Sequence, residues 1–280
     1  MRGTRPSPAK PGVGSEPGTW TPYPQLNTVL AELVTGAREA LAANFVGAYL
    51  TGSFALGDAD EFSDVDFIVV TRGEIASRQL DELQALHGRL HRLDVEWAQH
   101  LEGSYAPAGL LRRQQGPPSS FLFLDNGASE LQWDPHCNTA VVRWVLRERG
   151  VVLAGPDATT LVDAISRDQL RTEARARVHE YGAWARERDE VGSMSSWKQA
   201  YLVVTFCRLL HTRATGRVSS KREAGAWAMA ALDHEWTDLV RRALAARPHP
   251  WRRVHEPADP ASVARTLAFA EYAVGEAATL

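Results

Sequence analysis

The chain has 280 residues, of which 44% are hydrophobic, and it carries 31 lysines and arginines against 34 aspartates and glutamates. This length and hydrophobic content suit two well-packed domains and exclude a fibrous protein. The formal net charge of -3 argues against a protein that wraps nucleic acid, because such proteins are usually distinctly basic. The apolar runs are too short to span a bilayer, so we expect no membrane association.

The N-terminal segment, residues 1–24, is rich in Pro, Gly and Ser and has no apolar signal core, so we expect a disordered tail. Residues 25–155 are expected to form one domain and residues 156–280 a second. Cys137 and Cys207 provide no disulfide framework, which favours a reducing cytoplasm. The sequence leaves the oligomeric state open, with a monomer favoured.

Two short apolar segments, residues 46–50 and 67–70, predict buried central strands, and a polar motif joins them. The motif reads Gly52-Ser53-Phe54-Ala55-Leu56-Gly57, followed by Ser63-Asp64-Val65-Asp66. Glycine permits backbone conformations that bring N–H groups to a phosphate, and Ser53 adds a hydroxyl donor.

In an extended segment Asp64 and Asp66 point to the same side, while Val65 enters the core. Two carboxylates so near each other repel unless a cation lies between them. Magnesium suits the pair, because it takes one or two carboxylates and fills its shell with water and phosphate oxygens. The motif therefore predicts a site for a metal-bound triphosphate, and a turn with solvated acids is the plain alternative.

Further along, leucines at helical spacing predict a helix over residues 81–92, and residues 93–105 alternate more like a strand. Three acids in this second segment, Asp94, Glu96 and Glu102, have the same parity. The pattern alone therefore does not decide which of them joins the aspartate pair.

Asp125-Asn126-Gly127 is expected to form a turn. Asp134-Pro135 is typical of a helix start, and this helix would run to Gly150, with His136-Cys137-Asn138-Thr139 in its first turn. One His beside one Cys is too few ligands for zinc. Residues 151–156 are expected to form a connector.

The remainder is strongly helical. Residues 168–188 place Ala174, Val178, Tyr181 and Ala185 on one face, and residues 196–214 are apolar almost all round. A capping box at Ser220–Glu223 would open the next helix, with Trp227, Ala231 and Leu232 on the core, and a last helix would span residues 261–277.

The Gly-Ser turn, the Asp64-Val65-Asp66 triplet and the apolar strand resemble the nucleotidyltransferase superfamily of DNA polymerase beta, over roughly residues 45–105. The resemblance implies an α+β chain whose N-terminal domain is a mixed sheet with flanking helices. It also implies a third carboxylate on a neighbouring strand, which binds two metal ions together with Asp64 and Asp66. Two metal ions would orient an attacking hydroxyl and neutralise the α-phosphate as pyrophosphate leaves.

The C-terminal half, including VVLAGPDATTLV and FCRLLHTRATGRVSSKREAGAWAM, is similar to the all-helical domain of the aminoglycoside adenylyltransferases of the streptomycin/spectinomycin type. The likeness covers most of residues 28–247. The family places its acid in a Leu-Glu-small-Ser setting, which implies Glu102 as metal ligand or general base, with Asp94 second.

The same likeness implies that Lys221 contacts the nucleotide, and Arg208 matches an arginine of the family segment. A lysine in the first turn of a helix opposes the helix dipole, so its placement favours a bound anion there. A solvated lysine and a snorkelling or salt-bridged arginine are the plain alternatives.

The segment upstream departs from the family pattern, because Lys198 lies near a position where streptomycin users carry an acid for the cationic sugar. This argues against streptomycin itself, although Asp189 and Glu190 lie close by and could serve another amine. Trp197 and Tyr201 are four residues apart and could stack on a sugar or base, but such pairs are more often core.

The sequence thus predicts a magnesium-dependent adenylyltransferase that moves AMP from ATP to a hydroxyl of a small polar acceptor, such as an aminoglycoside-like antibiotic. Gly52, Ser53, Arg208 and Lys221 would bind the nucleotide, while Asp64, Asp66 and Glu102 would bind two magnesium ions and catalyse the transfer. Two alternatives stay open: a nucleotide-binding regulatory or antitoxin-type module, and an enzyme that nucleotidylates a protein or RNA. No nucleic-acid partner is expected.

Overall fold

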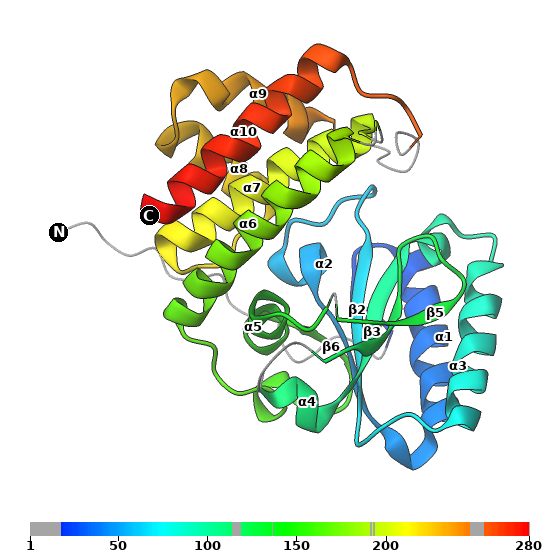
Figure 1. Cartoon of the computed structure of the whole chain (residues 1–280). Helices are drawn as coiled ribbons and strands as arrows, with labels where there is room; N and C mark the ends of the chain where they lie inside the picture. Colours follow the sequence, from blue (N-terminus) through cyan, green and yellow to red (C-terminus); the bar gives the residue numbers. More distant parts are fainter. Residues whose placement is uncertain are drawn as a thin grey trace. The chain divides into compact units, whose positions relative to one another are not determined.

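The computed structural model describes residues 18–113, 119–135, 137–190, 192, 194–246 and 255–279, and the chain forms two compact units (Figure 1). The first unit comprises the chain up to Ala55, Asp64–Asn138 and Val145–Asp163. The second comprises Leu56–Ser63, Thr139–Trp144 and the chain from Ala164 onward. The loop of residues 56–63, which joins the two halves of the polar motif, therefore belongs to the second unit.

The first unit is built on a six-stranded mixed sheet, ordered β5-β4-β3-β2-β1-β6. Only β2 and β3 pair in parallel, and the remaining neighbours are antiparallel. The prediction of a mixed sheet is confirmed, and of the two strands predicted as central, β2 lies at the centre while β1 lies between β2 and the edge strand β6. The strands are β1 (Phe45–Leu50), β2 (Val65–Thr71), β3 (Leu101–Pro107), β4 (Phe121–Leu124), β5 (Leu131–Asp134) and β6 (Val151–Ala154).

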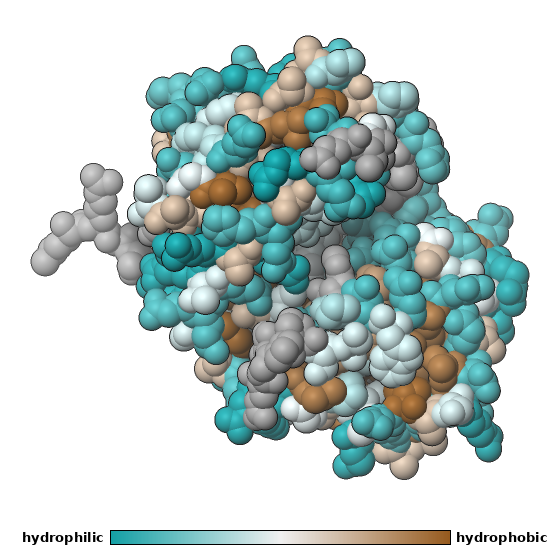
Figure 2. Space-filling view, viewed as in Figure 1, coloured by the Kyte–Doolittle hydropathy of each residue, from teal (hydrophilic) through white to brown (hydrophobic). Residues whose placement is uncertain are grey.

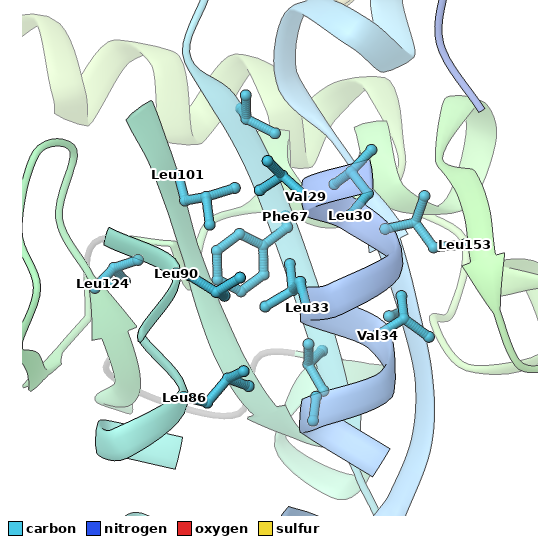
Figure 3. Close-up of a cluster of buried hydrophobic side chains, with 14 of the residues drawn as sticks. Val29, Leu30, Leu33, Val34, Phe67, Leu86, Leu90, Leu101, Leu124 and Leu153 are labelled. Atoms are coloured by element: carbon cyan, nitrogen blue, oxygen red, sulfur yellow. The ribbon is translucent and has the colours of Figure 1, made fainter. Parts of the chain in front are cut away.

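Two helices, α1 (Pro24–Leu41) and α3 (Ser77–His91), lie side by side against one face of this sheet (Figure 1). Their leucines and valines meet Phe67 of β2 in the core, because apolar residues at three- and four-residue spacing form one helix face (Figure 3). The residues labelled in this cluster are Val29, Leu30, Leu33, Val34, Phe67, Leu86, Leu90, Leu101, Leu124 and Leu153.

The shorter elements of the first unit connect the strands and complete its edges. Of the expected tail, residues 1–17 lie outside the described residues, and the next residues are packed. Thr21 is buried, and its carbonyl accepts a hydrogen bond from the Asn27 amide. The short elements are η1 (Ala42–Asn44), α2 (Gly52–Leu56), η2 (Glu96–His100), α4 (Ala108–Arg112), α5 (Ala140–Arg149) and η3 (Ala158–Thr160), of which the end of α2 at Leu56 and the start of α5 up to Trp144 belong to the second unit.

The predicted helix start at Asp134-Pro135 is wrong. Residues Leu131–Asp134 form β5, which pairs with β4, and α5 begins only at Ala140. Thr139 accepts a hydrogen bond from the Val142 N–H, and the Glu173 carboxylate accepts bonds from the N–H groups of residues 140 and 141. A carboxylate more than 30 residues away thus supplies the cap, which local sequence cannot reveal.

Two further predictions are corrected by strand pairing. The expected connector at residues 151–156 contains β6, which pairs with the edge of β1. The expected strand over residues 93–105 is a strand only from Leu101, because Glu96–His100 forms a 3-10 turn.

The second unit is helical, as predicted. The apolar face of α6 is buried as expected at Ala174, Val178 and Ala185, with Tyr181 partly buried, and the Ser220 side chain caps α8. Ala231, which we expected on the core, is exposed, and Ala224, Gly225 and Ala228 form the buried face instead. The helices are α6 (Arg167–Glu190), α7 (Ser196–Thr215), α8 (Lys221–Ala231), η4 (His234–Trp236), α9 (Thr237–Ala245) and α10 (Pro260–Thr279).

The surface drawn in Figure 2 is mainly hydrophilic, and its hydrophobic residues form separate small patches. Large apolar side chains that are exposed include Leu110, Trp133 and Val152. Single exposed apolar residues of this kind are ordinary on folded proteins. Within the described residues, no helix is both long and apolar enough to cross a membrane.

Candidate active site

The Gly-Ser turn lies directly against Asp66. Gly52 has φ +54°, and a Cβ built on it would lie 1.8 Å from Oδ2 of Asp66, so only glycine fits this backbone at this position. The Thr51 N–H donates to the Asp66 carbonyl at 2.9 Å, which fixes the turn to β2. The next residue, Ser53, lies on α2 and is partly exposed. The Gly-Ser turn and the Asp66 carboxylate are therefore in direct contact.

Aromatic packing holds α2 in place. The Phe54 ring meets Tyr23 at 6.2 Å and Trp97 at 6.0 Å between ring centroids, both edge-on. Such pairs add about 0.5–1.5 kcal/mol beyond the area they bury. Phe54, the residue after Ser53, thus anchors the segment that carries Ser53 to Tyr23 and Trp97.

The parallel register of β2 and β3 places Glu102 beside Asp66. Their Cα atoms are register partners, so both side chains project from the same face of the sheet. Each is the second residue of its strand, and each is partly exposed between fully buried neighbours. Gly103 allows this close pairing, because a Cβ there would lie 2.3 Å from the Phe67 carbonyl oxygen.

The other two candidate acids lie elsewhere. Asp94 is exposed and precedes the 3-10 turn, and Glu96 is exposed at the start of that turn. Glu102 is the one of the three whose strand places it in register with Asp66. Sequence parity could not separate them, because the pairing of two strands from different parts of the chain decides it.

Asp64 lies in the loop immediately before β2 and is partly exposed, while Val65 is fully buried as expected. Its Oδ1 accepts a hydrogen bond from the Asn126 amide at 2.6 Å. Asn126 belongs to the turn predicted at Asp125–Gly127, which joins β4 to β5. The turn itself was predicted, but the contact of Asn126 with Asp64 was not, because it spans 62 residues.

Cys137 lies within the field of the same carboxylates. The pKa of its thiol is raised to about 12, chiefly by burial; a hydrogen bond with Ser104 lowers the pKa, and the charges of Glu102, Asp66 and Asp134 raise it. A thiol with this pKa stays protonated near neutral pH, so it is a poor nucleophile. His136, the other residue weighed for zinc, lies outside the described residues.

Among the described residues, no group of three or more His, Cys, Asp and Glu side chains is placed so that it could hold a metal ion. Magnesium does not require one, because it binds through one or two carboxylates and takes phosphate and water oxygens for the rest. Asp66 beside Glu102, with Asp64 held by an amide, is a donor set of the hard oxygen type that this ion prefers.

In the second unit, the first turn of α8 is met by two carboxylates from the loop of residues 58–63, which we call the acidic loop. Arg222 contacts Asp58 at 3.2 Å and Asp60 at 2.6 Å, and its backbone N–H donates to Asp58 at 3.4 Å. The Ser220 hydroxyl accepts from the Glu223 N–H. An anion thus already lies at this helix end, so the helix dipole alone does not require a bound triphosphate.

Lys221 and Arg208 are both partly exposed, on α8 and α7 respectively. Both helices belong to the second unit. Their nucleotide contacts stay predictions that rest on the family resemblance.

The segment predicted to face the acceptor carries an aromatic cluster. Trp197 stacks on Tyr201 with ring centroids 5.1 Å apart, and the Tyr201 hydroxyl lies 2.9 Å from that of Tyr181. Lys198 is partly exposed in the first turn of α7, and Asp189 is exposed near the end of α6. The side chain of Glu190 and all of Ser193 lie outside the described residues.

Comparison with known proteins identifies two family models. Residues 34–106 match the nucleotidyltransferase domain, and residues 160–271 match the aminoglycoside adenylyltransferase C-terminal domain. Spectinomycin 9-adenylyltransferases of Staphylococcus aureus strains Mu50 and N315 are each 25% identical over 218 residues, covering 72% of this chain and 78% of theirs.

A solved structure also matches the fold. It is the spectinomycin adenyltransferase AAD(9) from Enterococcus faecialis with ATP and spectinomycin, and it superposes with a TM-score of 0.67. The match covers 89% of this chain and 98% of that chain, at 14% identity. At this identity the likeness establishes the order and arrangement of elements, and the chemistry must be argued from the residues.

Proposed function

The chain belongs to the aminoglycoside adenylyltransferases, a family of nucleotidyltransferases, and from this premise we propose that it transfers AMP from ATP to a hydroxyl of an aminoglycoside-like antibiotic. Spectinomycin is the first acceptor to test. The observation that carries the proposal is the register of Asp66 with Glu102 beside Gly52, because it joins a phosphate-sized turn to two carboxylates on one sheet face.

In this proposal the chain's own groups divide the work. Asp64 and Asp66, together with Glu102, would hold magnesium, two ions in all, which would polarise the phosphate oxygens and lower the pKa of the acceptor hydroxyl. Glu102 would accept the proton of that hydroxyl. The hydroxyl oxygen then bonds to the α-phosphorus, the bond from that phosphorus to the bridging oxygen breaks, and pyrophosphate leaves with the electron pair.

Four residues would hold the nucleotide in this proposal. Gly52 and Ser53 would present backbone and hydroxyl donors to the triphosphate, and Lys221 would add a positive charge, with Arg208 as a further contact. Because Asp58 lies at the start of α8, a phosphate bound there would have to compete with this carboxylate. The Lys221 assignment is therefore best tested by nucleotide affinity rather than by turnover.

Two observations support spectinomycin over streptomycin as acceptor. The named relatives act on spectinomycin, and Lys198 supplies a positive charge near a position where streptomycin users carry an acid. The cationic sugar of streptomycin would therefore lack the acid that pairs with it in streptomycin users. The stacked pair of Trp197 and Tyr201 would offer an apolar ring face beside Lys198. The expected cytoplasmic location stays a prediction.

The direct test is an acceptor panel with ATP labelled on the α-phosphate, read by mass spectrometry for the gain of AMP. We expect transfer to spectinomycin, no transfer to streptomycin, and no label on protein or RNA. Asp66→Ala should abolish transfer while the circular dichroism spectrum stays unchanged. Wild-type-like turnover in that variant would overturn the metal assignment, and no transfer to any antibiotic would overturn the acceptor class.

A further inference from the structure

We propose that Asn126 is a positioning residue for Asp64, and that His100 holds the Asn126 amide in the orientation this requires. The inference rests on the proposed function, since it concerns how one of the proposed metal ligands is held. It adds two residues to the site, Asn126 and His100, that neither the motif nor the family pattern indicated.

The contacts form a chain of three side chains. Asp64 Oδ1 accepts from Asn126 Nδ2 at 2.6 Å, and Asn126 Oδ1 lies 3.2 Å from Nδ1 of His100. An ionised carboxylate only accepts hydrogen bonds, so the amide must turn its NH2 group to Asp64 and its oxygen to His100. His100 must therefore carry a proton on Nδ1, and this fixes the ring tautomer that holds the amide in place.

Asp64 needs such a partner because of its place in the chain. It precedes β2, so the strand ladder that fixes Asp66 does not reach it. The Asn126 amide occupies a lone pair of Oδ1, which sets the rotation of the carboxylate that is proposed to bind the metal. Carboxylate ligands in metal sites are commonly held by such an outer hydrogen bond, and loss of the outer partner typically costs about 10- to 100-fold in metal affinity.

The turn that carries Asn126 is itself well fixed. The Asn126 N–H donates to the Asp125 carboxylate at 3.0 Å, and the Ala128 N–H donates to the Asp125 carbonyl at 3.0 Å. Gly127 has φ +79°, a value that glycine adopts without strain. Because the backbone and Asp125 already close this turn, the Asn126 side chain is not needed for it and is used for a contact 62 residues away.

The test compares two affinities measured by calorimetry, with an ATP analogue that has a methylene group between its α- and β-phosphates. The affinity for the metal-free analogue reports the phosphate contacts alone, and the affinity for its Mn²⁺ complex adds the metal contacts. The ratio of the two is the metal advantage. In Asn126→Ala we expect the metal advantage to fall about 10- to 100-fold, with the metal-free affinity unchanged.

His100→Ala should lower the metal advantage in the same direction. His100→Asn should restore it, because the asparagine amide nitrogen lies the same number of bonds from Cα as Nδ1. Glu130→Gln is the matched control, since this exposed residue of the same β4–β5 connection should leave both affinities unchanged. The Mg²⁺ concentration for half-maximal transfer should rise in Asn126→Ala by the factor measured in the calorimeter.

The outcomes separate the inference from the proposed function. A metal advantage within twofold of wild type in Asn126→Ala would overturn the inference, and so would an equal loss of both affinities, which indicates general loosening of the site. Asp64→Asn tests the underlying assignment: if it kept both the metal advantage and turnover, the proposed metal site would fail whatever Asn126 does.

Discussion

Gly52→Ala is the most direct test of the close contact between the Gly-Ser turn and the Asp66 carboxylate. The new Cβ would lie 1.8 Å from Oδ2, 2.4 Å from Cγ and 2.9 Å from Cβ of Asp66. Rotation of the Asp66 side chain would relieve the first two contacts. The third persists, because Cβ is attached to the backbone of β2, so the turn or the strand must also shift.

Gly52→Ala should have two separate effects, one on the free energy of unfolding and one on turnover. Alanine at φ +54° carries the left-handed penalty of roughly 1–2 kcal/mol, which lowers the free energy of unfolding. Displacement of Asp66 adds a loss of turnover, since a misplacement of about 1 Å in a catalytic group can cost about 100-fold. We therefore expect a modestly destabilised protein whose turnover falls by about two orders of magnitude.

Gly192→Ala is the matched control, because Gly192 has φ +62° and no atom within 4 Å of the added Cβ. It should show the same stability loss in urea unfolding with normal AMP transfer to spectinomycin. If the turnover of Gly52→Ala stayed within a few-fold of Gly192→Ala, Asp66 would not be held where the structure places it, or would not be needed.

Three further measurements test the site and its surroundings. Glu102→Gln should lower turnover by about 100- to 10,000-fold with ATP binding retained, as expected for loss of a general base. The matched variant Asp94→Asn should have normal turnover in the same assay. The reverse result would assign the role of general base to Asp94. Burial lowers the pKa of His87 to about 3, so the unfolded chain, with a histidine pKa near 6.5, takes up the proton first as the pH falls. The unfolding free energy should accordingly drop by about 1–2 kcal/mol from pH 7 to pH 5, and His87→Gln should remove most of that drop; an unchanged slope would exclude His87 as its cause. Arg222→Ala should change the free energy of unfolding by less than about 1 kcal/mol, because the ion pair with Asp58 is partly exposed. It should nevertheless speed amide hydrogen exchange in the acidic loop. Unchanged exchange would show that Arg222 does not order this loop.

The strands beside the motif and the helices of the second unit were predictable, because each carries a clear local period. Apolar runs marked β1 and β2, helical spacing marked α3 and α6, and a long segment that is apolar almost all round marked α7. The Ser220 cap was predictable for the same reason, since a capping box is read within four residues.

The errors occurred where a distant partner decides the local structure. Leu131–Asp134 is a strand because it pairs with β4, although Asp134-Pro135 has the local features of a helix start. The start of α5 depends on Glu173, a residue of another helix. Neither effect leaves a signal in the neighbouring sequence.

The sequence by itself indicated the kind of chemistry: a glycine-serine turn followed by two aspartates predicts a site for a phosphate and a hard metal ion, because those residue types at that spacing have few other uses. Tertiary structure decided which groups complete the site. The residue pattern left Glu102 and Asp94 equivalent and the family resemblance favoured Glu102, while the parallel register of β2 and β3 pairs Glu102 with Asp66; Asn126 reaches Asp64 because β4 and β5 turn beside it. The residues proposed to act together come from segments far apart in the chain, and the pairing of the strands sets which of them are neighbours.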